Sequence, residues 1–449
     1  MHITMKQSWR AGMARGVARA VAATFWAATL LWAAAAHAQL KIEITSGVTD
    51  PIPMAIVPFG STEAGDPATD VAAIVQHDLE GSGRFRGMPR TQMSVKPTRA
   101  ADVQLGDWRA SGNDYVVVGR VSPAQPGQLA VDFELLNALT GQQLANQRFV
   151  ATPAAMRDAA HKVSDVIYEK ILGVRGAFAT RIAYVSVDGT PPRQRYQLII
   201  ADADGENPRV VLESQQPVMS PAWSPDGEWL AYVSFENKKS TIYVQQVRTG
   251  ERRQVSARVG INGAPSWSPD GQKLALTLGG SNGNPDIYVL DLATQQLTRV
   301  TDDPSIDTEP AWTPDGRALY FTSDRAGGPQ IYRIGLGSGE RPRRITFGST
   351  YSARPRVSPD GTQLAMVMLD QGSYRIAVQD IASGNLRVLS HGSLDESPSF
   401  APNGAMIIYS GAEQSHRVLE RVSVDALTGQ RLKSEQADVR EPVWAPFSR

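Results

Sequence analysis

Short apolar runs separated by turn-forming residues fill the chain from about residue 178 to residue 449. Runs such as 230–234, 242–244 and 319–323 are rich in β-branched and aromatic residues, and glycine, proline, aspartate and asparagine lie between them. Short runs of this composition, bounded by turn signals, are typical of β-strands. The pattern therefore predicts an all-β region over residues 178–449.

One segment of this region recurs six times, and its full form is Pro-x-Trp-Ser-Pro-Asp-Gly. The third positions of the copies are Trp223, Trp267, Trp312, Val357, Phe400 and Trp444. Successive copies lie 44, 45, 45, 43 and 44 residues apart, and each unit contains four strand-like runs. Four strands in about 40 to 50 residues are typical of a β-propeller blade, so the repeat predicts a six-bladed β-propeller.

The two ends of the repeat array predict how the propeller closes. A second-strand run occurs at 181–186 without a Pro-x-Trp segment before it, whereas 442–446 is a first strand with no second strand after it. The C-terminal strand is therefore expected to complete the first blade. Such closure leaves no open sheet edge at the chain ends.

Residues 54–173 have a mixed pattern that predicts an α/β domain with a mixed sheet. The expected strands are 54–57, 115–118, 129–136 and 144–150, and the expected helices are 68–80, 101–110 and 154–171. Residues 39–53 precede this domain and begin with the alternating run 41–44. They also contain Gly47, Asp50 and two prolines, and are expected to form a mobile N-terminal arm.

Residues 1–38 have the pattern of a secretory signal peptide. The first 19 residues carry four basic side chains, the run 20–38 has no charged residue, and the run ends in Ala36-His37-Ala38. An uncleaved membrane anchor is the alternative, because the uncharged run is almost as long as the roughly 20 residues of a spanning helix. Cleavage before Gln39 predicts an exported chain without membrane insertion.

Composition limits the chemistry that the protein can carry out. The chain has 45 basic and 45 acidic residues, so its net charge gives no reason to expect nucleic-acid binding. It has no cysteine, which excludes disulfides, thiolate metal sites and a cysteine nucleophile. None of the four histidines after the leader is spaced as part of a metal-binding pair. We therefore expect no metal and no cofactor.

Two short segments resemble functional motifs but fit turns better. Gly279-Gly-Ser281-Asn-Gly283 has the spacing of a hydrolase nucleophile motif, but the run after it predicts a strand instead of the required helix. Asp202-Ala-Asp204-Gly-Glu-Asn207 resembles a calcium loop, but it lacks the later glutamate and lies where other blades have a turn. The repeated aspartates are expected to bond their own turns, and the tryptophans to pack between blades. The chain is thus expected not to be an enzyme.

The propeller, the leader and the N-terminal domain together resemble the TolB family of the Tol–Pal envelope system. Besides the repeats, the matching segments are 42–49, 56–59, 175–184, 262–265, 308–310, 322–324 and 394–398. The similarity covers essentially the whole mature chain. The N-terminal domain with its arm is the specific part, because related propellers also cap peptidases. Val357 in place of tryptophan, and Ile261 in place of a polar residue, depart from the family pattern.

The resemblance implies a periplasmic protein of a Gram-negative bacterium that binds the lipoprotein Pal through its propeller and TolA through its arm. The implied role is to maintain outer-membrane integrity and to help constrict that membrane during cell division; other envelope proteins are further candidate partners. The Pal contacts implied by the resemblance are Asn262, Ala264, Thr308, Glu309, Arg354 and Glu396. The implied TolA contacts are Lys41, Ile42, Glu43, Ile44, Ser46, Gly47 and Val48.

The loops between successive blades favour one face of the propeller for binding. They vary in length and polarity, whereas the Ser-Pro-Asp-Gly turns on the opposite face are uniform, and variation on a rigid scaffold is typical of binding surfaces. These loops are expected to end, around the channel mouth, at Ser220, Ala264, Glu309, Arg354, Ser397 and Glu441. Two other hypotheses stay open: a propeller hydrolase or peptidase-associated domain, and a carrier that holds a ligand in the channel. A peptidase would need a further domain of roughly 200 residues, and no segment is left for it.

Overall fold

The structure is a computed structural model that describes residues 50–61, 69–280, 283–337, 339–414, 416–425, 428–432 and 438–448. The expected signal peptide, residues 1–38, and the arm residues 41–48 lie outside the described residues. The α/β domain and the propeller belong to one compact unit. Among the described residues, no helix is both long enough and apolar enough to cross a membrane.

The α/β domain is built on a mixed sheet with the strand order β3-β1-β4-β5-β6, in which β2 also pairs with β4. The strands are β1 (Ile52–Ile56), β2 (Gly60–Ser61), β3 (Phe85–Gly87), β4 (Tyr115–Pro123), β5 (Leu129–Asn137) and β6 (Gln143–Ala151). β1 is parallel to β3 and β4, whereas β4, β5 and β6 are antiparallel. The mixed sheet expected from the sequence is therefore confirmed.

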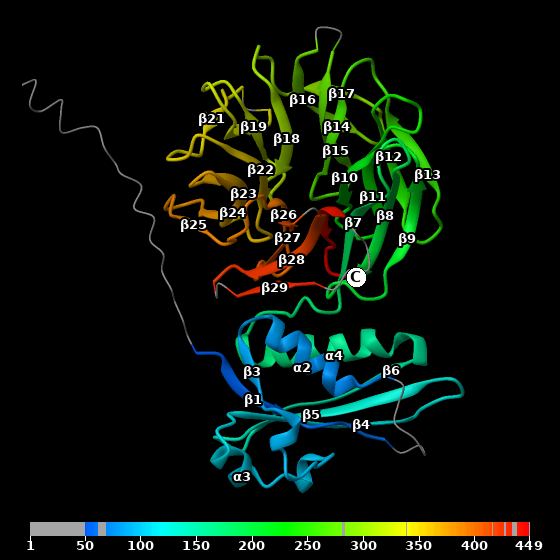
Figure 1. The fold of residues 1–449 in the computed structure, drawn as a ribbon, viewed down its shortest axis with the longest axis vertical. Helices are drawn as coiled ribbons and strands as arrows, with labels where there is room; N and C mark the ends of the chain where they lie inside the picture. The colour runs from blue at the N-terminus through cyan, green and yellow to red at the C-terminus, as the bar shows by residue number, and fades with distance from the viewer. Residues whose placement is uncertain are drawn as a thin grey trace, which may run out of the picture. The chain divides into compact units, whose positions relative to one another are not determined.

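Two helices, α2 (Val71–Gly81) and α4 (Met156–Leu172), cover one face of this sheet (Figure 1). α2 begins after Asp70, whose carboxylate accepts a hydrogen bond from the Ala73 amide. α4 ends at Gly173, whose left-handed backbone (φ 73°) is the conformation that glycine adopts most readily. The apolar faces of both helices pack with Phe133 and its neighbours into one buried core.

The helix expected over 101–110 is wrong in its first half. The structure has a single 3₁₀ turn, η2 (Ala100–Asp102), then extended backbone at Val103, and then a short helix, α3 (Leu105–Ala110). Trp108 is the one buried side chain of α3, and it packs against the opposite face of the sheet. A single anchor of this kind supports one or two helical turns but no continuous apolar stripe. Two further 3₁₀ turns are η1 (Arg90–Gln92) and η3 (Pro153–Ala155).

The rest of the described chain forms six four-stranded antiparallel sheets arranged as a propeller (Figure 1). The inner strands are β10 (Val218–Trp223), β14 (Asn262–Trp267), β18 (Asp307–Trp312), β22 (Ser352–Val357), β26 (Glu396–Phe400) and β30 (Val439–Trp444). The second strands are β11 (Trp229–Ser234), β15 (Lys273–Gly279), β19 (Ala318–Ser323), β23 (Gln363–Asp370), β27 (Met406–Glu413) and β7 (Arg181–Asp188). The third strands are β12 (Thr241–Gln246), β16 (Pro285–Asp291), β20 (Gln330–Gly335), β24 (Ser373–Asp380), β28 (His416–Ser423) and β8 (Arg195–Asp202). The outer strands are β13 (Arg252–Ser256), β17 (Leu297–Arg299), β21 (Arg343–Arg344), β25 (Leu386–Val388), β29 (Gly429–Arg431) and β9 (Arg209–Ser214).

The closing blade combines both ends of the repeat array. β30 pairs antiparallel with β7, and Trp444 lies opposite Ile182. The blade order is β30-β7-β8-β9, so the last strand of the chain supplies the inner strand of the first blade. The closure predicted from the sequence is confirmed.

Tryptophans of the inner strands hold neighbouring blades together, as expected. The indole Nε1 of Trp267 donates to the Ala222 carbonyl at 3.1 Å, and that of Trp312 donates to the Ser266 carbonyl at 3.0 Å. Trp223 donates in the same way to the carbonyl of Val443, in the closing blade, at 3.3 Å. Val357 has no such donor, so the inner strand β22 lacks this bond to the preceding blade.

The aspartates of the Ser-Pro-Asp-Gly turns bond their own turns, as expected. The Asp270 carboxylate accepts from the Ser268 hydroxyl at 2.5 Å and from the Gln272 amide at 3.0 Å. The Ser268 hydroxyl, followed by that amide, holds the pKa of Asp270 below its usual range. Asp226, Asp315 and Asp360 accept the equivalent bonds.

Candidate protein-binding site at the mouth of the propeller channel

Each inner strand contains a β-bulge, and the residue at the bulge has a left-handed backbone. These residues are Ser220, Ala264, Glu309, Arg354, Ser397 and Glu441, with φ between 43° and 58°. The register shifts at each of them, as between Met219 and Ala222 in β10. The expectation that the loops between blades end at these residues is wrong: the residues lie inside the strands, because the pairing continues on both sides of each bulge.

The six bulge residues line one cavity of about 720 Å³ along the channel, and we call them the mouth ring. A left-handed conformation costs a non-glycine residue roughly 1 kcal/mol or more, so six repeats of it need compensation by other contacts. A bulge also leaves its backbone amide without a partner in the sheet. Several of these amides are bonded by a side chain of the preceding blade.

This bonding explains why glutamates occur in the mouth ring. The Arg354 amide donates to Glu309 Oε2 at 3.0 Å, and the Ser220 amide donates to the Glu441 carboxylate. The Glu309 amide donates in turn to Thr277 Oγ1 at 3.2 Å. Each bond joins the bulge of one blade to a side chain of the blade before it.

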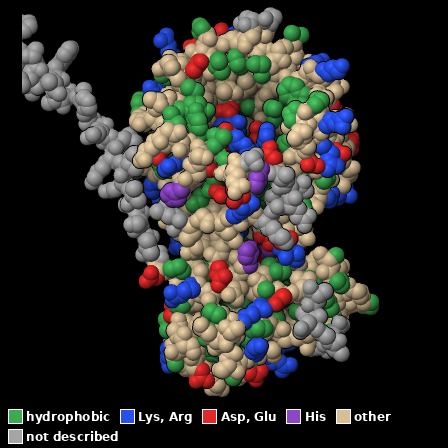
Figure 2. Space-filling view, in the orientation of Figure 1, with side chains coloured by type: hydrophobic (Ala, Val, Ile, Leu, Met, Phe, Trp, Pro, Cys, Tyr) green, Lys and Arg blue, Asp and Glu red, His purple; other side chains and the backbone are tan. Residues whose placement is uncertain are grey.

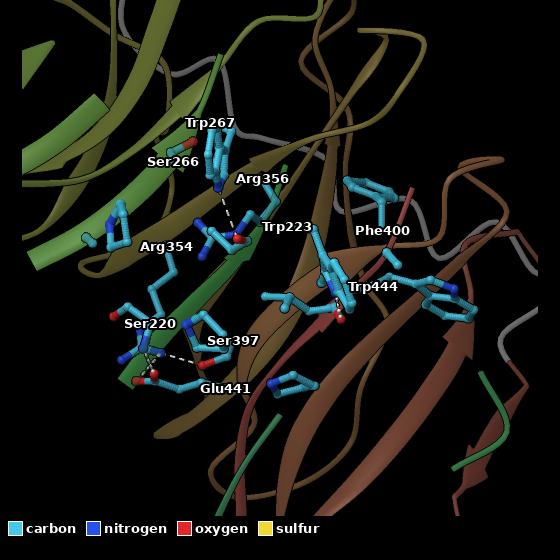
Figure 3. Close-up of a pocket in the computed structure, with 18 of the residues that line it drawn as sticks. Ser220, Trp223, Ser266, Trp267, Arg354, Arg356, Ser397, Phe400, Glu441 and Trp444 are labelled. Atoms are coloured by element: carbon cyan, nitrogen blue, oxygen red, sulfur yellow. Dashed lines mark hydrogen bonds and ion pairs between the residues drawn. The ribbon is translucent and has the colours of Figure 1, made fainter. Parts of the chain in front are cut away.

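Arg354 is the charged centre of the mouth ring (Figure 3). Its Nε lies 3.0 Å from Glu309 Oε1, its Nη1 lies 3.8 Å from Glu441 Oε1, and Nη1 also donates to the Ser397 hydroxyl. Burial lowers the pKa of Arg354, but the carboxylates of Glu309, Glu441 and Glu396 raise it further, so the net shift is upward. The arginine therefore stays charged and is shared between two carboxylates.

The mouth ring is ordered by its own bonds and is still accessible from the channel. The side chains of Arg354 and Glu309 are 31% and 22% exposed. Glu309 also accepts a hydrogen bond from Thr322 Oγ1 at 3.0 Å, which holds its carboxylate in place. Figure 2 shows basic and acidic side chains together near the centre of the propeller, with apolar side chains around them. Such an arrangement of polar groups can recognise a partner with little reorganisation.

The structure brings four of the six predicted Pal contacts together. Ala264, Thr308, Glu309 and Arg354 all line the channel cavity. Glu396 lies beside the ring residue Ser397 and is bound by Arg417 Nη1 at 2.7 Å.

Asn262 lies behind this surface, because the residue is only 1% exposed. Its Oδ1 accepts from the Ser256 hydroxyl at 2.6 Å and from the Arg258 amide at 3.0 Å, and its Nδ2 donates to the Arg258 carbonyl at 2.8 Å. The asparagine thus braces the loop that leads into β14. Contact between a partner and any of the six residues stays a prediction.

Exposed apolar side chains also lie on the loops that lead into β14, β18 and β22, and the sequence pattern singled out only Ile261 among them. Val259 is 80% exposed and Phe347 is 57% exposed, and Ile261 and Ile306 are also exposed. Exposed apolar groups near a polar centre are typical of a surface that binds another protein. Val259, Ile306 and Phe347 are each an apolar residue in an otherwise polar loop, a signal that strand or helix periodicity does not detect.

A second polar cluster joins the α/β domain to the propeller; its central residues are Asp78, His161 and Asp204, and we call it the domain-junction cluster. Asp78 Oδ2 lies 2.7 Å from His161 Nδ1 and accepts from the Ser164 hydroxyl at 2.7 Å. His161 Nε2 lies 3.8 Å from Asp204 Oδ2, and Arg157 pairs with the same Asp204 oxygen. All three central residues are buried.

The ligand atoms of Asp78, His161 and Asp204 lie within 4.8 Å of one another, a spacing that could hold a metal ion. The Arg157 guanidinium already neutralises Asp204, which favours a protonated histidine over a metal. Burial lowers the pKa of His161, but Asp78 and then Asp204 raise it more strongly, so the net shift is upward. In the segment that resembles a calcium loop, Asp202 is paired with Arg181 at 3.1 Å.

The segment that resembles a hydrolase nucleophile motif leads into a strand. β16 follows it, so the predicted strand is confirmed and the strand–turn–helix geometry of a nucleophile elbow is not formed there. Ser281 itself lies outside the described residues.

Two family models match the chain. The model of the TolB amino-terminal domain matches residues 40–144, and that of the TolB beta propeller domain matches residues 168–448. The chain belongs to the TolB family. The resemblance inferred from the sequence is confirmed, and so are the two expected fold classes.

Relatives with curated names are similar over almost the whole chain. A protein of Thioalkalivibrio sulfidiphilus (strain HL-EbGR7) named "Tol-Pal system protein TolB" is 56% identical over 92% of this chain and 95% of its own length. A protein of the same name from Xylella fastidiosa (strain M12) is 48% identical over 91% of this chain and 93% of its own length. The crystal structure of TolB from Acinetobacter baumannii matches with a TM-score of 0.82 at 43% identity, over 89% of this chain and 97% of that chain. These names indicate no catalytic activity.

Proposed function

We propose that the protein is a periplasmic, non-enzymatic component of the Tol–Pal system and that the mouth ring binds the lipoprotein Pal. Membership of the TolB family and the names of the relatives support the system. The mouth ring is the observation that supports the site, because it joins an ordered charged centre to a cavity and to exposed apolar loops. In this role the protein helps to maintain outer-membrane integrity and to constrict that membrane during division.

Reversal of one charge in the mouth ring tests the Pal site. Glu309→Arg places a cation beside Arg354 and is expected to weaken Pal binding at least tenfold, because breaking a buried interfacial charge pair costs about 2 to 5 kcal/mol. Glu309→Arg also removes the acceptor of the Arg354 amide, so we expect a lower melting temperature as well. Glu309→Gln keeps an acceptor oxygen and separates the two effects: it should preserve the melting temperature and still weaken binding.

Asp270→Asn is the matched control, because Asp270 lies in a Ser-Pro-Asp-Gly turn at the other end of an inner strand. It should leave Pal affinity, measured by calorimetry, unchanged. If this control lost binding while both Glu309 variants bound like the parent, Pal would bind the opposite face.

The N-terminal arm is the proposed site for TolA. Residues 40–49 alternate apolar and polar side chains, and an extended peptide of this kind can add a strand to the sheet edge of a partner. A mature chain without residues 39–50 is expected to lose TolA binding in a pull-down and to keep Pal binding. Retention of TolA would place its site elsewhere.

A further inference from the structure

One arginine projects into the channel where the other blades have short side chains. Arg356 follows the proline of β22 and lies opposite Ala365 of β23. The residues at the same register position of the other inner strands are Ala222, Ser266, Ala311, Ser399 and Val443. Arg356 therefore brings a single positive charge into a part of the channel where small neighbours leave room.

The guanidinium of Arg356 has few partners. Its Nη1 donates to the carbonyl of the preceding residue, Pro355, at 2.8 Å. Within the described part of the chain it forms no ion pair, whereas Arg354 is paired with two carboxylates. A guanidinium carries five N–H donors, so the residues that the structure describes leave most of the hydrogen-bonding capacity of Arg356 unused.

Figure 3 shows Arg356 apart from the group formed by Ser220, Arg354, Ser397 and Glu441, toward Trp267. The wall nearby includes Trp223 and Trp267, whose indole N–H groups already bond main-chain carbonyls. Burial lowers the pKa of Arg356, and the charge of Arg354 lowers it too, although Glu309 and Glu441 act in the opposite direction. The charge is thus partly buried, and no carboxylate of the described residues forms an ion pair with it.

We propose that Arg356 is the centre of an oxyanion site in the channel, which takes one carboxylate or phosphate group. The fixed planar fork of a guanidinium matches both groups through two parallel hydrogen bonds. The cavity of about 720 Å³ has room for either group with water around it. This inference does not depend on Pal binding, because it rests on residues of the channel interior.

The channel presents two groups of charged side chains in a fixed order, first the mouth ring and then Arg356. A molecule that enters at the mouth meets Glu309 and Glu441, which share Arg354, and then meets Arg356. The oxyanion that binds Arg356 can come from a free inorganic anion or from the carboxylate of a peptide that enters the channel. Phosphate and acetate at equal ionic strength represent them in the experiment.

Melting temperatures of the mature protein test the site. Phosphate at about ten times its Kd should raise the melting temperature by about 2 °C over a chloride buffer of the same ionic strength. Arg356→Gln should abolish this shift. Arg387→Gln, which removes the same charge from the outer strand β25 of the same blade, should keep it. A shift with acetate as well would identify a carboxylate as an accepted ligand, whereas a shift with phosphate alone would identify a phosphate-type anion.

The melting temperatures of the parent and of Arg356→Gln in the chloride buffer provide a second test. Arg356→Gln removes a charge without a counter-ion, so it should melt at or above the parent temperature. A parent protein without any anion-dependent shift, or an Arg356→Gln variant that retains the shift, would overturn the proposal. A variant that melts several degrees below the parent in chloride would also overturn it, because Arg356 would then be a structural brace.

Discussion

The mouth ring and the domain-junction cluster use the same chemistry in different surroundings. Both pair cationic side chains with carboxylates that come from separate parts of the sequence. In the ring, Arg354 and Glu309 are partly exposed to the channel, whereas Asp78 and His161 are each only 1% exposed. The difference in exposure decides what each cluster can do.

A buried polar group must keep its partner, because an unpaired charge in the protein interior is very costly. Asp78, His161 and Asp204 therefore suit a permanent connection between the α/β domain and the propeller. Charges that water can reach lose less when a contact breaks. The ring can exchange an internal bond for a bond to a partner, which is what a binding site requires.

Among the substitutions that test the difference between the two clusters, Asp78→Ala is expected to lower the unfolding free energy most. The substitution leaves the imidazole of His161 and the hydroxyl of Ser164 without their shared acceptor. Loss of one partner of a buried ion pair costs about 3 to 5 kcal/mol, and urea unfolding should show a decrease of this size. A decrease below about 1 kcal/mol would mean that the loss of an ion pair in the domain-junction cluster costs no more than the loss of an exposed pair.

A smaller, pH-dependent effect is expected from Asp165, which lies in α4 and accepts from the Phe178 amide at 2.7 Å. Burial raises the pKa of Asp165 to about 6, against the two backbone amides that lower it. A raised folded-state pKa means that the fold favours the protonated acid. The contribution of Asp165 to stability is therefore full below pH 3.8 and is lost as the pH rises through about 6.

Asp165→Asn tests this effect, because the amide does not titrate. From pH 4 to pH 7 the parent should lose about 2 to 3 kcal/mol of unfolding free energy relative to the variant. Parallel stability curves for the two proteins over this range would contradict the assignment. The pKa of Asp270 is lowered instead. The unfolding free energy of the parent relative to Asp270→Asn should therefore decrease as the pH falls, at a lower pH than for Asp165.

The smallest effect is expected from Glu441→Gln in the mouth ring. The amide oxygen still accepts from the Ser220 backbone, and only the weak ion pair with Arg354 at 3.8 Å is lost. Partly exposed pairs contribute about 0 to 1 kcal/mol, so thermal unfolding should change little. A loss comparable to that of Asp78→Ala would remove the distinction between the two clusters.

The sequence by itself determined the propeller, its closure, the mixed sheet and the family. These features depend on strand-length apolar runs and on turns such as Ser268–Gly271, whose bonds join residues a few positions apart. Local bonds of this kind leave a repeated pattern in the sequence. For the same reason the sequence does not predict the true extent of the helix in 101–110: the stability of this helix depends on where Trp108 packs, which is a tertiary contact.

Only the tertiary structure decided the two polar clusters and the surroundings of Arg356. Asp78 and His161 are 83 residues apart in the sequence, and Ser220 and Glu441 are 221 apart. The bulges that turn the mouth-ring residues left-handed appear in the register of paired strands and not in any single strand. Whether a charged residue is paired, buried or open to the channel depends on groups that the fold brings together, so its role cannot be read from its own segment.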